Sequence, residues 1–248
     1  MATIHLFLTG KGGVGKSFAA ALLYQYLRKK LADQTDNPYQ LVAYDTDPVN
    51  STFAGYKEFE VTGLKIMDGD DIDPSSFDRL VDEICALNGE AQVIVDNGAS
   101  CYVSLCSYIK GNNAFDTLRD EGHAVLIHTL VTGGQALGET LNELRTLSRH
   151  FPDVPLVVWL NPYFGEISMD GQKFQEFKFY KEASANIKAI IEIPHIKQVL
   201  FAKDMGTLLA RKWSFEAGVN SSLPLMSRQR FKNMWRNIHQ AIDQAGLV

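Results

Sequence analysis

The stretch Thr9-Gly10-Lys11-Gly12-Gly13-Val14-Gly15-Lys16-Ser17-Phe18 lies between an apolar segment, 4–8, and an apolar-striped segment, 17–31. Its four glycines allow a loop in which successive backbone N–H groups point at one anion. Lys16 adds a compact cation, Ser17 a hydroxyl for Mg²⁺, and the following helix the positive end of its dipole. Strand, glycine-rich loop and helix in this order predict a phosphate-binding loop, with a glycine-rich hairpin turn as the alternative.

The chain has 248 residues and a formal net charge of −5. A chain of this length buries roughly 70–75% of the surface of its unfolded state, which is enough for one large core. We therefore expect a single domain over residues 1–248. The acidic balance disfavours a surface that is basic throughout, but it leaves a local basic patch for DNA open.

Targeting and cysteine patterns point to a reducing compartment. The three cysteines have no C-x-x-C spacing, so free thiols are expected rather than a disulfide framework or a zinc site. The sequence contains neither a signal-peptide pattern nor a run of 18 apolar residues. These features predict a cytoplasmic protein without membrane insertion.

Apolar strand-like runs alternate with helical segments, as in a doubly wound, mostly parallel sheet with helices on both faces. This alternation predicts a three-layer α/β/α fold of the P-loop NTPase class, with its ligand at the carboxyl ends of the strands. The expected strands are 4–8, 41–44, 64–67, 92–95, 124–129, 156–160 and 190–193, and the expected helices are 17–31, 75–87, 135–150, 196–209 and 225–245.

Carboxylates follow two of the expected strands. Asp45 and Asp47 stand one residue apart where the chain leaves the second strand, and Pro48 favours a fixed turn there. Asp96 follows three β-branched residues, as in a Walker B strand, and is expected to contact Mg²⁺ through water. Mg²⁺ takes one or two carboxylates, phosphate oxygens and waters, which Ser17, Asp96 and Asp45 fit. An Asx-capped turn is the alternative for the 45–48 segment.

The first lysine of the loop separates this chain from a generic phosphate-binding loop. Lys11 cannot comfortably share the phosphates with Lys16 from the same side. The segment 11–17, Lys-Gly-Gly-Val-Gly-Lys-Ser, resembles the deviant Walker A signature of the ParA/MinD (SIMIBI) ATPases. The resemblance implies a homodimer on ATP binding, in which Lys11 reaches the partner's phosphates like an arginine finger. A solvated surface lysine is the alternative.

The same resemblance implies roles for residues at the strand ends. In the D-x-D-P pattern of 45–48, Asp45 lies near the water shell of the metal and Asp47 orients the attacking water. Asn161 resembles the asparagine that hydrogen-bonds adenine, with Pro194 beside it, although a turn former before proline is the alternative. The absence of an N-K-x-D sequence favours ATP over GTP. After Asp96 the chain reads 97–100 Asn-Gly-Ala-Ser instead of a proline-containing switch, which leaves γ-phosphate sensing open.

A narrower resemblance covers nearly the whole chain. Five segments look like those of the TraL/StbB-type ATPases of conjugative plasmids: 45–50, 68–72, 96–100, 131–135 and 159–163. This resemblance implies a role in plasmid transfer, stability or positioning, and a plasmid-encoded protein partner. It also implies a bacterial, cytoplasmic location with nucleoid or plasmid association, and leaves direct or indirect DNA binding open.

Two function classes stay open at this point. The first is a dimerising ATPase switch with slow, partner-stimulated hydrolysis, in which Lys11, Lys16 and Asp47 are catalytic. The second is a metabolic P-loop enzyme, similar to ATP-dependent ligases and synthetases, which needs a small-molecule pocket with its own acid and base groups. The sequence shows no such cluster.

The expected C-terminal helix, 225–245, has a mixed character. Apolar residues recur at spacings of three and four, which favours packing against the core. Its basic residues leave contact with DNA phosphates as a second interpretation, and membrane anchoring is disfavoured by its acidic Asp243 and short basic face. These basic residues are Arg228, Arg230, Lys232 and Arg236.

Overall fold

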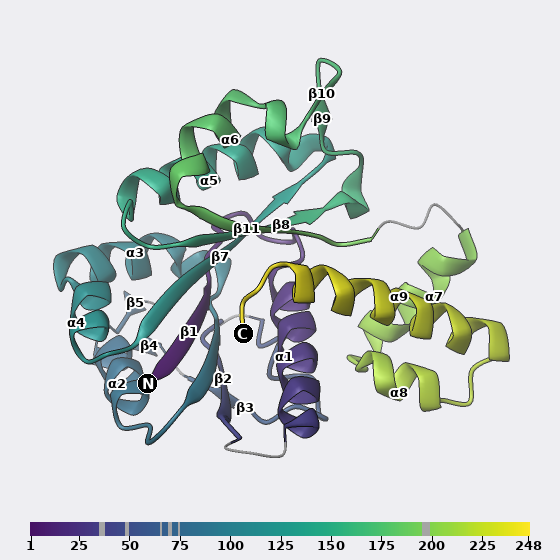
Figure 1. Cartoon of the computed structure of the whole chain (residues 1–248), viewed down its shortest axis with the longest axis horizontal. Helices are drawn as coiled ribbons and strands as arrows, with labels where there is room; N and C mark the ends of the chain where they lie inside the picture. The colour runs from purple at the N-terminus through teal and green to yellow at the C-terminus, as the bar shows by residue number, and fades with distance from the viewer. Residues whose placement is uncertain (35–37, 48–49, 65, 69–70, 74, 195–198) are drawn as a thin grey trace.

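The structure is a computed structural model that describes residues 1–34, 38–47, 50–64, 66–68, 71–73, 75–194 and 199–248. Within them, a seven-stranded sheet has the order β11-β8-β7-β1-β6-β2-β3 (Figure 1). All neighbouring strands of this sheet run parallel. The strands are β1 (Ala2–Phe7), β2 (Gln40–Asp45), β3 (Val61–Gly63), β6 (Ala91–Asp96), β7 (Ala124–Thr132), β8 (Leu156–Asn161) and β11 (Ile187–Glu192).

Helices cover both faces of the sheet, which confirms the expected three-layer α/β fold (Figure 1). One face packs against α2 (Ser75–Cys85), α3 (Tyr102–Gly111), α4 (Ala114–Asp120), α5 (Leu137–His150) and α6 (Lys178–Ala183). The other face packs against α1 (Lys16–Asp33), α7 (Val199–Ala210), α8 (Phe215–Asn220) and α9 (Leu225–Gln244).

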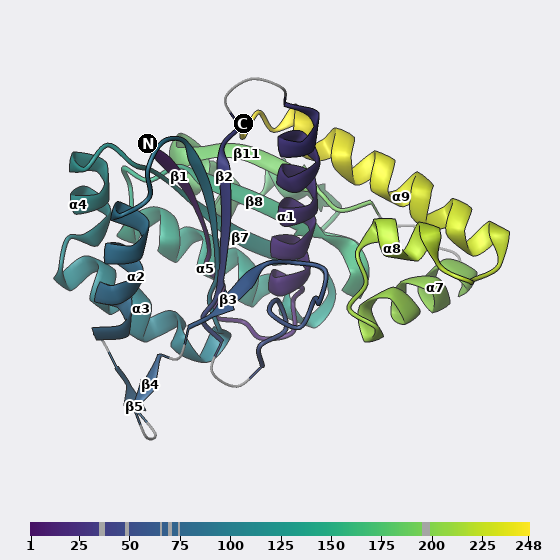
Figure 2. The same cartoon turned by 90° about the horizontal axis from the view of Figure 1, so that it is seen from below.

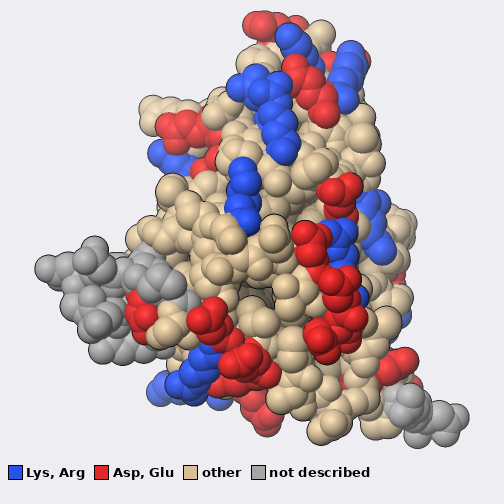
Figure 3. Space-filling view, turned by 90° about the vertical axis from the view of Figure 1, so that its left-hand side faces the viewer, with Lys and Arg blue, Asp and Glu red and all other residues tan. Residues whose placement is uncertain are grey.

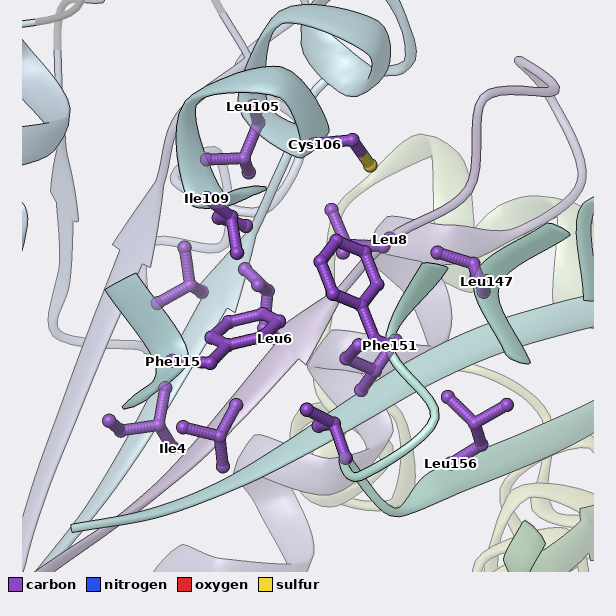
Figure 4. Packing of buried hydrophobic residues seen from close by; sticks show 14 of the residues in the cluster. Ile4, Leu6, Leu8, Leu105, Cys106, Ile109, Phe115, Leu147, Phe151 and Leu156 are labelled. Carbon is purple, nitrogen blue, oxygen red and sulfur yellow. The ribbon is translucent and has the colours of Figure 1, made fainter. Parts of the chain in front are cut away.

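Strand β1 shows how the alternation of side chains builds the two cores. Ile4, Leu6 and the following Leu8 point to the layer of α3, α4 and α5, where they meet apolar side chains of these helices (Figure 4). Phe7 points to the opposite layer and belongs to the core beneath α1 and α9. Because successive side chains of a strand alternate between faces, one central strand contributes to both cores.

The region after β2 differs from the expected pattern. The predicted strand 64–67 is wrong: the sheet strand is β3, and Met67–Asp68 forms β4, which pairs antiparallel with β5 (Asp71–Ile72). Leu64 and Ile66 are instead buried as anchors of this segment in the core, which explains why the run is apolar without being a ladder strand. Residue 65 lies outside the described residues.

Several short elements were not expected from periodicity. They include α3, α4, α6 and α8, and a hairpin of β9 (Ser168–Met169) and β10 (Gln172–Lys173). Short helices of one to three turns give too few repeats for a periodic signal. The expected helix 196–209 corresponds to α7, which begins at Val199, and residues 195–198 lie outside the described part of the chain.

The last three helices form one group at the side of α1. Figure 2 shows α7 and α8 beside α9, and the β4–β5 hairpin projecting from the sheet. Phe231, Met234, Ile238 and Ile242 of α9 are buried, as the spacing of apolar residues indicates. Arg230 pairs with Asp204 of α7 at 2.6 Å, so this basic residue is used within the fold.

Two surface observations bear on the expected partners. No described helix combines the length and apolar character needed to cross a bilayer. On the face shown in Figure 3, Lys and Arg side chains are interspersed with Asp and Glu over the described atoms. That face is therefore of mixed sign.

Candidate functional site

The phosphate-binding loop connects β1 to α1 at the carboxyl edge of the sheet. Gly13 and Gly15 have φ angles of 77° and 97°, in the left-handed region that glycine adopts without strain. Helix α1 begins directly afterwards at Lys16, so its unpaired N–H groups face the concave side of the loop. This arrangement can bind an anion of several charges.

Asn161, at the end of β8, holds the loop from the neighbouring side. Its Nδ2 donates to the backbone oxygen of Val14 at 2.8 Å, and its Oδ1 accepts from the N–H of Tyr163 at 3.2 Å. A Cβ added to Gly15 would lie 2.7 Å from Asn161 Nδ2, so the loop closes on this amide only with glycine there. The sequence predicted that Asn161 hydrogen-bonds adenine, and the structure shows that its amide contacts the loop.

Lys16 and Asp96 form a buried ion pair between the loop and the end of β6. Lys16 is 8% exposed and Asp96 0%. Lys16 Nζ donates to Asp96 Oδ1, whereas the buried Oδ2 has no hydrogen-bond partner among the described residues. A buried carboxylate oxygen without a partner is costly unless a cation or a water fills its coordination.

Asp45 stands beside Asp96 in register on the adjacent strand. Its Oδ1 accepts from the N–H of Asp47 at 3.0 Å, and its Oδ2 from that of Ala54 at 2.9 Å. Burial raises the pKa of the Asp45 carboxyl above its ordinary value, against the lowering effect of these two N–H groups. Asp45 therefore shapes the turn that follows β2 as well as facing the loop.

The Asn-Gly segment after Asp96 packs against the Asp47 turn. Thr46 donates its hydroxyl to Asn97 Oδ1 at 3.1 Å, and both side chains are buried. A Cβ on Gly98 would lie 2.9 Å from Asp47 Cγ, so glycine lets the two strand ends approach each other. Thr46 and Gly98 were not among the predicted site residues, although their place next to the carboxylates was a usable signal.

A pocket of about 510 Å³ opens on the other side of the loop. Its lining combines the two predicted base-side residues, Asn161 and Pro194, with aromatic side chains that were not predicted. Tyr163 and Phe164 are 63% and 50% exposed at this site. The lining from the phosphate-binding loop and α1 is Gly13, Gly15 and Phe18.

Lys11 lies apart from Lys16 and contacts the first turns of α5. Its Nζ is 2.8 Å from the Glu139 carboxylate, with side-chain exposures of 40% and 60%. Glu143, one turn further along α5, faces the backbone N–H groups of Gly10 and Lys11. Neither glutamate was predicted; their spacing of four on one helix after β7, a neighbour of β1, was the available signal.

The structure thus brings most of the predicted site residues to one edge of the sheet. Three of them lie together around the buried ion pair: Lys16, Asp96 and Asp45. Asn161 and Pro194 lie in the pocket beside the loop, and Lys11 extends away to α5. The two lysines therefore have different carboxylate partners, Glu139 on α5 for Lys11 and Asp96 at the end of β6 for Lys16.

Comparison with known proteins identifies relatives of this chain. No family model matches the chain. "Protein TraL" of Escherichia coli is 42% identical over 250 residues, which cover 100% of both chains. The chain belongs to the TraL family. A second TraL protein of Escherichia coli is 40% identical, also over 100% of both chains.

The fold of this TraL-family chain is similar to that of a protein of known structure. The MinD cell division protein of Aquifex aeolicus superposes with a TM-score of 0.53 over 96% of this chain and 97% of that one. Their sequence identity is 15%, so the likeness concerns the fold. The expected resemblance to TraL proteins and to the ParA/MinD fold is confirmed.

Proposed function

We propose that this TraL-family protein is a Mg-ATP-dependent ATPase switch of the ParA/MinD type, acting in conjugative plasmid transfer or in plasmid stability and positioning. The observation that carries the proposal is the buried Lys16–Asp96 pair at the phosphate-binding loop, with Asp96 Oδ2 left without a partner among the described residues. A lysine beside a carboxylate at the start of a helix suits a bound triphosphate and its metal ion.

The residues around the pair fit Mg²⁺. Asp96 Oδ2 offers a buried oxygen, Ser17 a hydroxyl on the first turn of α1, and Asp45 a carboxylate on the adjacent strand. Bound Mg²⁺ would neutralise charge on the phosphates. Because both oxygens of Asp45 already accept backbone hydrogen bonds, we assign it a contact through a metal-bound water.

Two further residues would act in hydrolysis. We assign Asp47 the orientation of the attacking water, because it follows the end of β2 and packs closely against Gly98, two residues after Asp96. We assign Lys11 to the phosphates of a second subunit, since its ammonium pairs with Glu139 of α5, whereas that of Lys16 pairs with Asp96. Loss of its ion pair with Glu139 is a small cost, because both side chains are partly exposed.

The base would occupy the pocket beside the loop. Asn161 and Pro194 line it, and the exposed rings of Tyr163 and Phe164 suit stacking on a flat purine. We propose one ATPase domain over residues 1–248, located in the bacterial cytoplasm. Its partners in this proposal are a second copy on ATP binding and a plasmid-encoded protein, with DNA contacted directly or through that protein.

Light scattering tests the switch. Solution mass is measured without nucleotide, with ADP–Mg²⁺ and with ATP–Mg²⁺, each with and without DNA, for wild type, Asp47→Ala and Lys11→Ala. We expect a doubling from 27.6 kDa only with ATP, retained in Asp47→Ala and lost in Lys11→Ala. Lys29→Ala, on exposed α1 surface, serves as the lysine control and should dimerise normally.

The remaining outcomes decide between the function classes. An ATP-dependent dimer of Lys11→Ala would exclude the crossover role of this lysine. An unchanged mass of wild type under all conditions would reject the dimerisation switch and favour a small-molecule P-loop enzyme. Stimulation of ATP turnover by DNA or a protein partner, rather than by a small molecule, would support the switch.

A further inference from the structure

Helix α5 carries a second carboxylate against the start of the phosphate-binding loop. A Cβ on Gly10 would lie 2.9 Å from Glu143 Oε1 and 2.9 Å from the ring of Tyr102 on α3. The loop backbone therefore rests on both helices, and its first turn cannot move without moving against Glu143. The N–H groups of Gly10 and Lys11 face this carboxylate and favour its charged form.

The Glu143 carboxylate has few hydrogen-bond donors or cations around it to offset the burial of its charge. Its Oε2 is buried and has no hydrogen-bond partner among the described residues. The titratable groups that act on it or lie against it are Lys11 on the loop, Glu139 on α5, and Tyr102 and Cys106 on α3. Lys11 is the cation of this group, and its charge lowers the pKa of the Glu143 carboxyl.

We propose that Glu143 is a positioning residue for Gly10 and Lys11 that binds a proton when the Lys11 side chain leaves α5. The inference rests on the proposed function, in which Lys11 moves to a second subunit. Glu139 pairs with the Lys11 ammonium and Glu143 faces the backbone N–H of the same residue, so both carboxylates of α5 act on one loop segment.

Burial brings the titration of Glu143 into the physiological range. Desolvation by burial is the largest cause and raises the pKa of its carboxyl, as does the nearby charge of Glu139. The backbone N–H groups of Lys11 and Gly10 and the Lys11 ammonium lower it, and the net result is a pKa of about 7. Departure of Lys11 removes one lowering contribution, so the pKa rises and the neutral form gains population. The state in which the Lys11 side chain has left α5 therefore binds more protons than the state in which it contacts α5. Proton linkage then favours that state as the pH falls.

The direct test follows the Glu143 carboxyl itself. Its ¹³C chemical shift is titrated from pH 5 to 9 without nucleotide in wild type, Lys11→Ala and the control Lys29→Ala, and the signal is assigned by its loss in Glu143→Gln. We expect a higher pKa in Lys11→Ala than in wild type, and no change in Lys29→Ala. Equal titrations of wild type and Lys11→Ala overturn the inference.

The second test measures the consequence for assembly. The dissociation constant of the ATP–Mg²⁺ dimer is measured by light scattering at pH 6, 7 and 8 for wild type, Glu143→Gln and the exposed control Glu121→Gln. We expect the dissociation constant of the wild-type and Glu121→Gln dimers to decrease as pH falls. The decrease should be up to about tenfold per pH unit for each subunit that binds a proton. Glu143→Gln should lose most of that dependence while keeping a dimer.

These outcomes separate the inference from the function on which it rests. A wild type that stays monomeric with ATP at every pH rejects the dimer switch, and the carboxyl titration without nucleotide then decides on Glu143 alone. Dimers of wild type and Glu143→Gln with the same pH dependence overturn the role of Glu143 and leave the switch intact. Should Glu143→Gln fail to fold, Glu143→Asp assigns the signal in its place, and the comparison of wild type with Lys11→Ala still decides.

Discussion

Asn161 Nδ2 donates to the backbone oxygen of Val14 at 2.8 Å, and this bond joins the end of β8 to the phosphate-binding loop. The two residues are 147 positions apart in the chain. Asn161, whose amide is expected to hydrogen-bond adenine, therefore also supports the backbone of the loop expected to bind the phosphates. An experiment can distinguish the two roles of Asn161, support of the loop and recognition of the base.

We expect Asn161→Ala to weaken ATP and GTP binding by a similar factor of about five, because one hydrogen bond to the loop is lost. Isothermal titration calorimetry with both nucleotides measures the two affinities. Asn112→Ala, at an exposed position after α3, is the control and should bind as wild type does. A much larger loss for ATP than for GTP would show that the amide reads the base directly.

We expect Lys16→Ala to abolish nucleotide binding and to lower the free energy of unfolding by about 3 kcal/mol, because the buried Asp96 loses its cation. Urea unfolding measures the second effect. The double variant Lys16→Ala/Asp96→Asn should recover part of this stability without recovering binding. If the double variant is as unstable as the single one, the stability effect does not arise from the unpaired charge of Asp96.

We expect Gly98→Ala to slow ATP hydrolysis at least about tenfold while nucleotide affinity stays within about threefold, because its Cβ would displace Asp47 from a 2.9 Å approach. Phosphate release at saturating ATP measures the rate. Gly206→Ala is the matched control, since its Cβ on α7 meets nothing within 4 Å. Unchanged turnover of Gly98→Ala would argue against Asp47 as the residue that orients water.

A buried histidine pair should make a contribution to stability that is lost in acid. Trp159 Nε1 donates to His128 Nδ1 at 2.9 Å, so His128 Nε2 carries the proton toward His5 Nδ1, also at 2.9 Å, and His5 Nε2 faces Gln92. Burial lowers the pKa of His5 to about 4 and that of His128 well below its ordinary value. Both rings are therefore neutral in the folded chain near pH 7.

At these two histidines the unfolded chain binds more protons than the folded one below about pH 6.5, so their contribution to stability falls as pH decreases through that range. For His5 we expect a loss of about 2 kcal/mol between pH 7 and pH 5. Urea unfolding at both pH values, with wild type, His5→Gln and the exposed control His150→Gln, isolates this contribution. The same pH dependence in wild type and His5→Gln would exclude it.

The sequence predicted the order of most elements because their signals are local. The loop with Gly13 and Gly15, the apolar strand before it and the amphipathic helices α5 and α9 each show their character within one segment. The expected strand 64–67 failed for the converse reason. Its apolar residues Leu64 and Ile66 are buried against side chains from other segments. A local apolar pattern does not distinguish residues buried in this way from residues of a strand paired in a sheet.

By itself, the sequence determined the phosphate-binding loop, the α/β class and the carboxylates that end two strands, since glycine spacing and side-chain periodicity are properties of neighbouring residues. The tertiary structure decided which groups meet: Asn161 with Val14, Asp96 with Lys16, and Glu139 and Glu143 with the start of the loop. These contacts depend on strand order, which places β1 between β6 and β7. Strand order arises from the packing of the whole chain, and no short segment encodes it.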